Sequence, residues 1–256
     1  MNVLVFDIET IPDVALGRRA LSLDGLADGQ VAKAMFTQAR AHSGSDFLSH
    51  EQHRVVAISC VLRHRDQLKV WSLGDEDSSE RELLQRFFDG IERYTPDLVS
   101  WNGAGFDLPV MHYRALAAGI QAPRYWEVGD EDREFRYNNY LGRFHWRHMD
   151  LMDILSGYQG RARASLEDMA ALLQLPGKLG FSGDKVWDAY QRGELAAIRN
   201  YCETDVLNTY LVYLRFEFLR GRLDVAGLAS ERQKVRDMLR ESGAAHHLEF
   251  LRALGD

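Results

Sequence analysis

The chain has 256 residues, of which 46% are hydrophobic and 27% charged, and its formal net charge is -7 at pH 7. This composition is typical of a globular protein with a full core and excludes extensive disorder, and no stretch approaches the roughly 20 apolar residues of a membrane-spanning helix. The cysteines Cys60 and Cys202 form no Cys-x-x-Cys pair, which disfavours a zinc site or a disulfide framework. The acidic net charge alone neither indicates nor excludes binding of nucleic acid, because phosphate contact depends on where positive charges lie.

The first predicted strand is the short apolar run Val3–Phe6. No basic segment precedes it, so we expect no signal peptide and a cytoplasmic location. Residues 11 to 50 contain repeated glycines and arginines, so their composition differs from that of the rest of the chain. We expect them to form an excursion with one short amphipathic helix near Val31–Arg40.

Strands and helices alternate in the next part of the chain. Val55–Leu62 and Leu68–Leu73 are predicted strands whose polar connection is typical of an antiparallel hairpin. A helix is predicted over Ser79–Tyr94, because it has capping-box spacing at its start and apolar residues on one face. Asp97–Trp101 is the next predicted strand, and a helix follows from Pro109 to about Gly119.

The last third of the chain is predicted to be mostly helical. Ser165 begins a helix that stops by Pro176, a second helix covers Leu195–Phe218, and a charged helix covers about Ser230–Leu254. This order of elements predicts a mixed α/β fold.

Four carboxylates and one tyrosine stand in three separate segments. Asp7 and Glu9 are two residues apart at the end of a predicted strand, so both side chains face the same side. Asp107 follows a glycine-containing loop between a strand and a helix. Tyr201 and Asp205 are four apart in a helical pattern and therefore share a helix face.

Carboxylates that meet in a folded protein need a counter-charge, since two like charges at about 4 Å repel by about 4 kcal/mol at an effective dielectric near 20. Oxygen ligands without histidine or cysteine favour magnesium or manganese over zinc. Two such ions roughly 3.5 to 4 Å apart suit hydrolysis of a phosphodiester. Each motif alone also fits a capping, surface or packing role, but their combination favours the metal site.

The motifs resemble those of the DEDD superfamily of 3'-5' exonucleases, which have a ribonuclease H-like fold. Asp7 and Glu9 match the first motif, Asp107 the second, and Tyr201 with Asp205 the third. The tyrosine implies the tyrosine subclass. More closely, the chain resembles stand-alone bacterial proteins related to the exonuclease domain of family B DNA polymerases, which implies a mixed five-stranded sheet flanked by helices.

The resemblance implies a role for each residue of the three motifs. Asp7 would bridge two Mg²⁺ or Mn²⁺ ions, and Glu9 and Asp205 would hold the ion that activates water. Asp107 would act on the second ion. Tyr201 would orient the attacking water, because its ordinary pKa of about 10 makes it a poor general base at neutral pH.

Further positions follow from the same resemblance. Thr10 and Phe106 would touch the terminal nucleotide, and Asn102 would shape the loop before Asp107. The resemblance covers about residues 1 to 220, which we expect to form the exonuclease domain. We expect 221 to 256 to form a C-terminal helical extension.

Residues 133 to 163 interleave arginines with aromatic residues, a pattern that suits a single strand because bases stack on rings and phosphates meet guanidinium groups. We predict that Arg143 and Arg147 grip the strand, although a solvated arginine face above aromatic core residues fits the pattern equally. Lys178 and Lys185 are weaker candidates for phosphate contact. The predicted partner is single-stranded nucleic acid, with DNA favoured over RNA, and the oligomeric state stays open.

Asp150 and Asp153 are expected to be structural, and His145 and His148 to be surface residues or to support the site from outside. Two other functions stay open: a catalytically silent nucleic-acid-binding adaptor and an RNA-directed 3'-5' exonuclease. Recognition of the 2'-hydroxyl would decide the second, and no residue pattern in the sequence indicates it.

Overall fold

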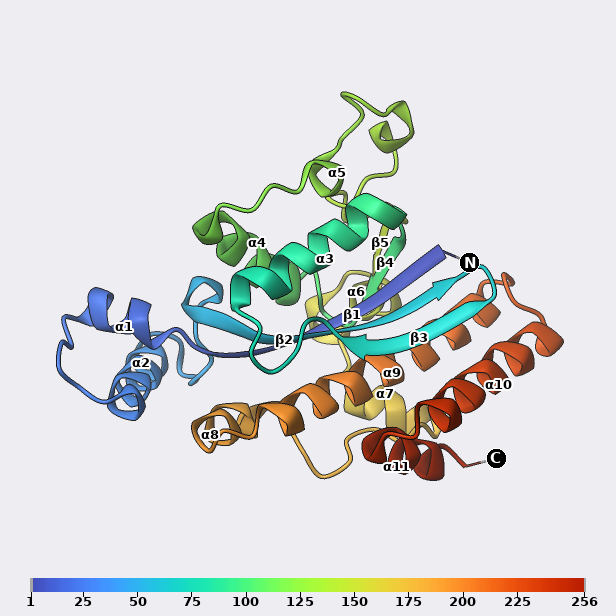
Figure 1. Ribbon diagram of the computed structural model, residues 1–256. Coiled ribbons are helices and arrows are strands. Elements are labelled where there is room, and N and C mark those ends of the chain that lie inside the picture. Colours follow the sequence, from blue (N-terminus) through green and yellow to red (C-terminus); the bar gives the residue numbers. More distant parts are fainter. Residues whose placement is uncertain (1, 256) are drawn as a thin grey trace.

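The centre of the fold is a mixed five-stranded sheet with the strand order β3-β2-β1-β4-β5 (Figure 1). Its strands are β1 (Asn2–Pro12), β2 (His53–His64), β3 (Gln67–Ser72), β4 (Asp97–Ser100) and β5 (His148–Asp150). β2 runs antiparallel to β1 and β3, whereas β1, β4 and β5 run parallel to one another. The computed structural model describes residues 2–255, and it has the α/β architecture that the sequence predicts.

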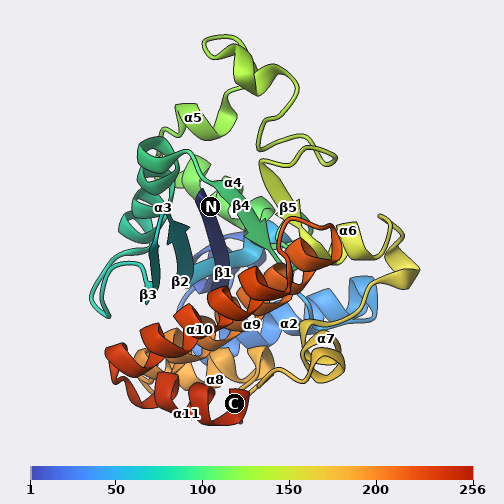
Figure 2. The same ribbon diagram turned by 90° about the vertical axis from the view of Figure 1, so that its right-hand side faces the viewer.

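Helices cover both faces of the sheet, because side chains alternate between the faces along each strand. The helices are α3 (Glu80–Tyr94) and α4 (Asp107–Ala118) on one face, and α9 (Leu195–Leu219), α10 (Val225–Ser242) and α11 (Ala245–Leu254) on the other. Leu4 and Phe6 belong to the core beneath α3 and α4. Val3 and Val5 point the opposite way, into a core shared with the other three helices, which Figure 2 shows gathered on that side.

The excursion between β1 and β2 contains two helices, where the sequence predicted a single short one near Val31–Arg40. These are α1 (Val14–Leu21) and α2 (Asp28–Ser43), which lie beyond one end of the sheet (Figure 1). Gly17 explains why α1 was missed. A Cβ at this buried position would collide with Met35 of α2, so glycine allows α1 and α2 to pack closely. Because glycine also has a low helix propensity, the sequence pattern does not indicate a helix here.

The segment between α4 and α9 is made of short elements, several of which the sequence did not predict. They are α5 (Pro123–Trp126), α6 (Leu151–Leu155), α7 (Leu166–Leu173) and α8 (Val186–Gln191), and 3-10 turns lie at Arg133–Arg136, Gly160–Ala162 and Gly183–Lys185, with another at His50–Gln52. β5 has three residues, which is too short for a hydrophobic period to reveal, and it is specified by its pairing with β4. No helix within residues 2–255 is both long and apolar enough to cross a membrane.

The charged C-terminal segment forms two helices, where the sequence predicted one over about Ser230–Leu254. Gly243 separates them in a left-handed conformation (φ 65°), which ends α10. The break lets α11 fold back, so Leu239 of α10 and Phe250 of α11 both reach the buried core that contains Val3. The two helices are therefore packed into the same core as the sheet.

Candidate active site

β1 delivers two of the predicted carboxylates to one face of the sheet. Asp7 and Glu9 follow Val3 and Val5 in the two-residue alternation, so they face α9. The pairing of β1 with β2 shifts register between Glu9 and Thr10, and such an irregularity re-aims the side chains that follow it. Glu9 is buried, and Asp7 is half-buried.

α9 brings its residues to the same place. Tyr201, Asp205, Asp107 and Asp7 all line one cavity of about 330 Å³. Cys202 also belongs here, because its Sγ lies 3.4 Å from the backbone oxygen and 3.6 Å from Oδ2 of Asp7. No sequence pattern separates this cysteine from an ordinary buried thiol, and only the fold reveals its position. We call Asp7, Glu9, Asp107 and Asp205 the carboxylate cluster.

Asp107 is held at the first turn of α4 by contacts on two sides. Its Oδ1 accepts a hydrogen bond from the backbone N–H of Ile8 (3.2 Å), which fixes the carboxylate against β1. The loop before it is shaped by Asp150, whose two oxygens accept hydrogen bonds from the N–H groups of Asn102 and Ala104, each at 3.0 Å. Asp150 thus has the structural position that the sequence predicted, and Asn102 lines the carboxylate cavity.

The carboxylate cluster concentrates negative charge where water has little access. Burial raises the pKa of Asp7 well above its usual range, and the charges of Asp107, Glu9 and Asp205 raise it further. Burial, followed by the charges of Asp205 and Asp107, does the same for Glu9. Burial also raises the pKa of Asp107 to about 7 and that of Asp205 to about 6. Four carboxylates in this state fit a divalent cation, which removes the repulsion between them.

Tyr201 lies in the cavity as a protonated phenol. Burial raises the pKa of its hydroxyl well above 10, and the neighbouring charge of Asp205 raises it further. The ring packs against Phe181, with centroids 5.0 Å apart. The hydroxyl therefore suits hydrogen-bond donation or positioning, and proton abstraction is disfavoured.

A second cavity of about 630 Å³ adjoins the carboxylate cavity, and both are lined by Ile8, Phe106 and Lys178. Thr10 lines it, and its Oγ1 lies 2.8 Å from Nδ1 of His53. We call this the aromatic pocket, because Phe36, Phe47, Phe106 and Trp187 are among its lining residues.

Two aromatic side chains of the aromatic pocket were missed by sequence reasoning. Phe47 and His53 lie against Phe106, with ring centroids 5.3 and 5.0 Å away. Phe47 is 59% exposed although it is a large apolar side chain beside a cavity. The excursion thus supplies a wall of this pocket, and a phenylalanine in a polar segment was the one available signal.

The two arginines proposed to grip the strand differ from each other. Arg143 keeps 49% of its side chain exposed, pairs with Asp153 at 2.9 Å and lies over the ring of Tyr158. Arg147 keeps only 12%, stacks 3.9 Å from the Phe135 ring centroid and donates through Nε to a backbone oxygen. Neither lines the carboxylate cavity or the aromatic pocket. Their contact with nucleic acid stays a prediction.

The remaining polar residues singled out in the sequence have mostly internal partners. His148 is buried with Nε2 2.8 Å from the hydroxyl of Ser100, and His145 accepts a backbone hydrogen bond from Asn139. Lys178 lies between the carboxylate cavity and the aromatic pocket, whereas Lys185 contacts a backbone oxygen in its own loop.

Comparison with known proteins gives a consistent result. Over residues 45–254 the chain matches the family described as "Predicted 3'-5' exonuclease related to the exonuclease domain of PolB". This match includes Asp107, Tyr201 and Asp205, begins after Asp7 and Glu9, and continues through both C-terminal helices.

Curated relatives and a solved structure point the same way. A DNA polymerase of Archaeoglobus fulgidus is 27% identical over 167 residues, which are 63% of this chain and 20% of the polymerase. A DNA polymerase of Pyrococcus glycovorans is 32% identical over 88 residues, 32% of this chain and 11% of that one. The chain thus spans about a fifth or less of the length of these relatives.

The family B DNA polymerase of Pyrobaculum calidifontis has a similar fold, with a TM-score of 0.50 and 19% identity over 93% of this chain and 28% of the polymerase. The fold is ribonuclease H-like, as the sequence predicts. The chain belongs to the family of predicted 3'-5' exonucleases related to the exonuclease domain of PolB.

Proposed function

We propose that the protein is a metal-dependent 3'-5' exonuclease that removes nucleoside monophosphates from the 3' end of single-stranded nucleic acid, with DNA favoured. The observation that carries this proposal is the carboxylate cluster, in which three buried acids and the half-buried Asp7, all with raised pKa values, share a site with a protonated tyrosine. The family membership supports the reaction, and the DNA polymerases among the relatives support DNA.

The carboxylate cluster would hold two divalent ions, Mg²⁺ or Mn²⁺, because its donors are hard oxygens. Bound there, the ions would activate a water molecule and stabilise the leaving oxygen of the phosphodiester. The charges of Asp107, Glu9 and Asp205 all raise the pKa of Asp7, so we expect Asp7 to take part in holding both ions.

Tyr201 would orient the attacking water through its hydroxyl. A phenol whose pKa is raised above 10 keeps its proton at neutral pH, so it can position the water but cannot deprotonate it. We therefore expect another group in the site to deprotonate the water, while Tyr201 holds the water in position.

The aromatic pocket would receive the terminal nucleotide. Phe106 offers a ring on which a base can stack, and Thr10 adds a hydroxyl in the same cavity. Lys178 lies where the pocket meets the carboxylate cavity and offers a positive charge for a phosphate oxygen. The last phosphodiester would then lie at the carboxylates, and the rest of the strand would extend away from the aromatic pocket.

The test is digestion of 5'-labelled single-stranded DNA and of RNA of the same sequence, each with Mg²⁺, Mn²⁺ or a chelator. We expect a ladder that shortens from the 3' end with DNA, that needs the metal, and that disappears in Asp7→Ala. Binding without any digestion would identify an adaptor, and faster digestion of RNA would identify a ribonuclease; either result would overturn the proposal as stated.

A further inference from the structure

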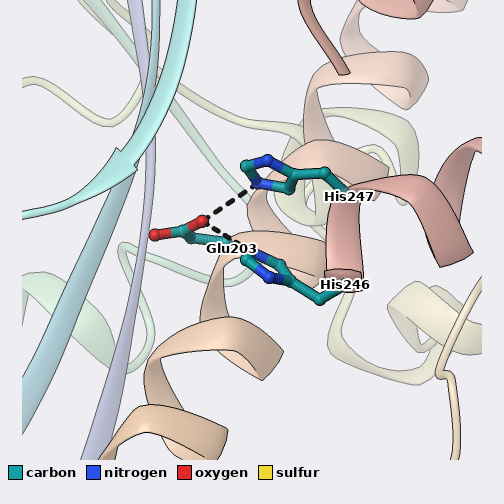
Figure 3. Close-up of side chains that lie close together, drawn as sticks. All are labelled: Glu203, His246 and His247. Atoms are coloured by element: carbon teal, nitrogen blue, oxygen red, sulfur yellow. Dashed lines mark hydrogen bonds and ion pairs between the residues drawn. The ribbon is translucent and has the colours of Figure 1, made fainter. Parts of the chain in front are cut away.

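A second group of metal-ligating side chains lies on the other face of α9. Glu203 is two residues from both Tyr201 and Asp205, a rotation of about 200° on an α-helix, so it faces away from the carboxylate cluster. Figure 3 shows its carboxylate meeting the imidazoles of His246 and His247, which come from the first turn of α11. We call Glu203, His246 and His247 the histidine cluster.

The candidate ligand atoms of the histidine cluster converge on one point. Nε2 of His246 lies 2.8 Å from Oε2 of Glu203, and Nε2 of His247 lies 3.0 Å from the same oxygen. These atoms all lie within 4.8 Å of one another. Two imidazoles and a carboxylate make a common three-ligand set for zinc, which leaves a fourth position for water.

His247 provides an independent reason to expect a ligand. The residue is only 4% exposed, yet its Nε2 makes no hydrogen bond within residues 2–255, because the 3.0 Å approach to Glu203 lacks the required alignment. The short distance does not replace that alignment, since the strength of a hydrogen bond depends steeply on its angle. A buried nitrogen without a partner is costly, and a cation would satisfy it.

The outer contacts of the histidine cluster suit metal binding. Nδ1 of His247 lies 2.5 Å from the hydroxyl of Ser242, and when it donates its proton there, Nε2 is left with a free lone pair. The hydroxyl of Ser72 donates to Oε1 of Glu203 at 2.7 Å, so Oε2 stays available. Each of these two ligands is thus oriented by a hydroxyl on its far side.

An ion pair alone explains the cluster less well. One carboxylate can balance one imidazolium, but the two rings lie 4.1 Å apart, and a second positive charge there would be repelled. Two neutral imidazoles, one carboxylate and one divalent cation avoid this conflict.

We propose that Glu203, His246 and His247 form a second metal site that takes Zn²⁺ or a similar transition-metal ion and fastens α11 to α9. Imidazole ligands select such ions over Mg²⁺. Tetrahedral ligands about 2.0 to 2.1 Å from zinc are about 3.4 Å apart, so the carboxylate moves back by a few tenths of an ångström on binding. The spacing of the cysteines disfavours zinc, and only the fold brings the adjacent histidines near the C-terminus to Glu203.

The test uses the full chain carrying Asp7→Asn and Asp205→Asn, so that metal bound by the carboxylate cluster does not contribute. We expect this protein to bind one Co²⁺ per chain with the visible absorption of a tetrahedral site, and one Zn²⁺ to displace it. We also expect Zn²⁺ at about 100 times its dissociation constant to raise Tm by about 5 to 10 °C relative to chelator.

Three variants in that background complete the test: His246→Gln, Glu203→Gln and, as the matched control, His42→Gln at an exposed position on α2. The first two should lose the cobalt absorption and the zinc-dependent rise in Tm, and the control should keep both. Each variant is compared with itself in chelator, so a general loss of stability does not imitate a loss of metal binding. Stoichiometric binding that survives in His246→Gln and Glu203→Gln, or no binding in the parent, would overturn the proposal.

Discussion

Two clusters of ionisable side chains meet opposite faces of α9, and burial has opposite outcomes in them. In the carboxylate cluster, burial raises the pKa of every acid, and the charges of neighbouring cluster acids raise those of Asp7 and Glu9 further. In the histidine cluster, contacts with two imidazoles and a hydroxyl outweigh burial and lower the pKa of Glu203. Burial alone therefore does not decide the behaviour of a carboxylate, and its neighbours determine whether it needs an added cation.

The largest expected effect is the loss of activity in Asp7→Ala. Asp7 experiences the charge of all three other acids, so its removal should destroy the site and slow nucleotide release by at least about 10³-fold. The same change removes a repelled buried charge, so the metal-free Tm should stay equal or rise. Rates at saturating Mg²⁺ and melting curves in chelator measure both effects.

Asp89→Ala is the matched control, because this aspartate is exposed on α3 and accepts a hydrogen bond from Gln85 of its own helix. It should leave both the rate and the Tm unchanged. An Asp7→Ala protein with normal activity would mean that the carboxylate cluster is not the active site.

The next largest effect is on pH dependence. Metal must displace the protons of Asp107 and Asp205, whose pKa values are about 7 and about 6, so affinity for Mn²⁺ should fall by about 100-fold from pH 7.5 to 5.5. In the metal-free protein these raised pKa values mean that the folded state binds more protons between about pH 4 and 7. Their contribution to stability therefore falls as pH rises through that window, and metal binding reverses the loss.

The measurement is the difference in Tm with and without Mn²⁺ at a series of pH values. Buried histidines such as His148, whose pKa is lowered to about 4 by burial, contribute with the opposite sign but equally with and without the metal. They cancel in the difference. A metal-induced shift in Tm that does not grow between pH 5.5 and 7.5 would show that the carboxylates are already ionised.

Tyr201→Phe should have a smaller effect that falls mainly on kcat. The ring keeps its packing against Phe181, so only the positioning hydroxyl is lost, and we expect kcat to fall by about 10²-fold with little change in KM. Single-turnover and steady-state kinetics separate the two constants. If kcat were unchanged, Tyr201 would be a packing residue only.

Phe106→Ala should act on KM. Loss of one stacked base costs about 1 to 3 kcal/mol, so we expect KM for single-stranded DNA to rise by about tenfold while kcat changes little. Tyr113→Ala, at an exposed aromatic position on α4, is the control and should change neither constant. A fall in kcat without a rise in KM would mean that Phe106 stabilises its loop and does not contact the substrate.

The smallest expected effect separates the two arginines. Arg143→Ala should raise KM about two- to threefold and weaken its dependence on salt, since half of this side chain is exposed. Arg147→Ala should lower Tm instead, because its guanidinium packs on Phe135. Equal effects of both changes on KM would support the prediction from the sequence that both arginines contact the strand.

Much of the fold and of the candidate site could be predicted from residue spacing and helix-capping patterns along the chain. The two-residue period placed Asp7 and Glu9 on one face, and the four-residue spacing placed Tyr201 and Asp205 on one helix face. The helix at 79–94 was predicted from its capping residue, Ser79, whose side chain accepts a hydrogen bond as expected.

What could not be predicted depends on contacts between distant segments. Cys202 meets Asp7 across 195 positions of sequence, and Phe47 reaches Phe106 only because the excursion folds back. Gly17 looks like a helix breaker until its contact with Met35 is known. Neither periodicity nor composition carries such information, because it arises from tertiary packing.

The hydrogen bond between Asp107 and Ile8 determines how many oxygens Asp107 can offer. β4 pairs with β1 only as far as Val5, so the N–H of Ile8 has no strand partner on that side and takes Oδ1 of Asp107 instead. That oxygen replaces a missing rung of the sheet, so we expect Oδ2 to be the oxygen that would face a cation in the proposed metal site. Asp107→Asn should keep the rung while it removes the charge. The same side chain thus completes the sheet and would take part in holding the ion.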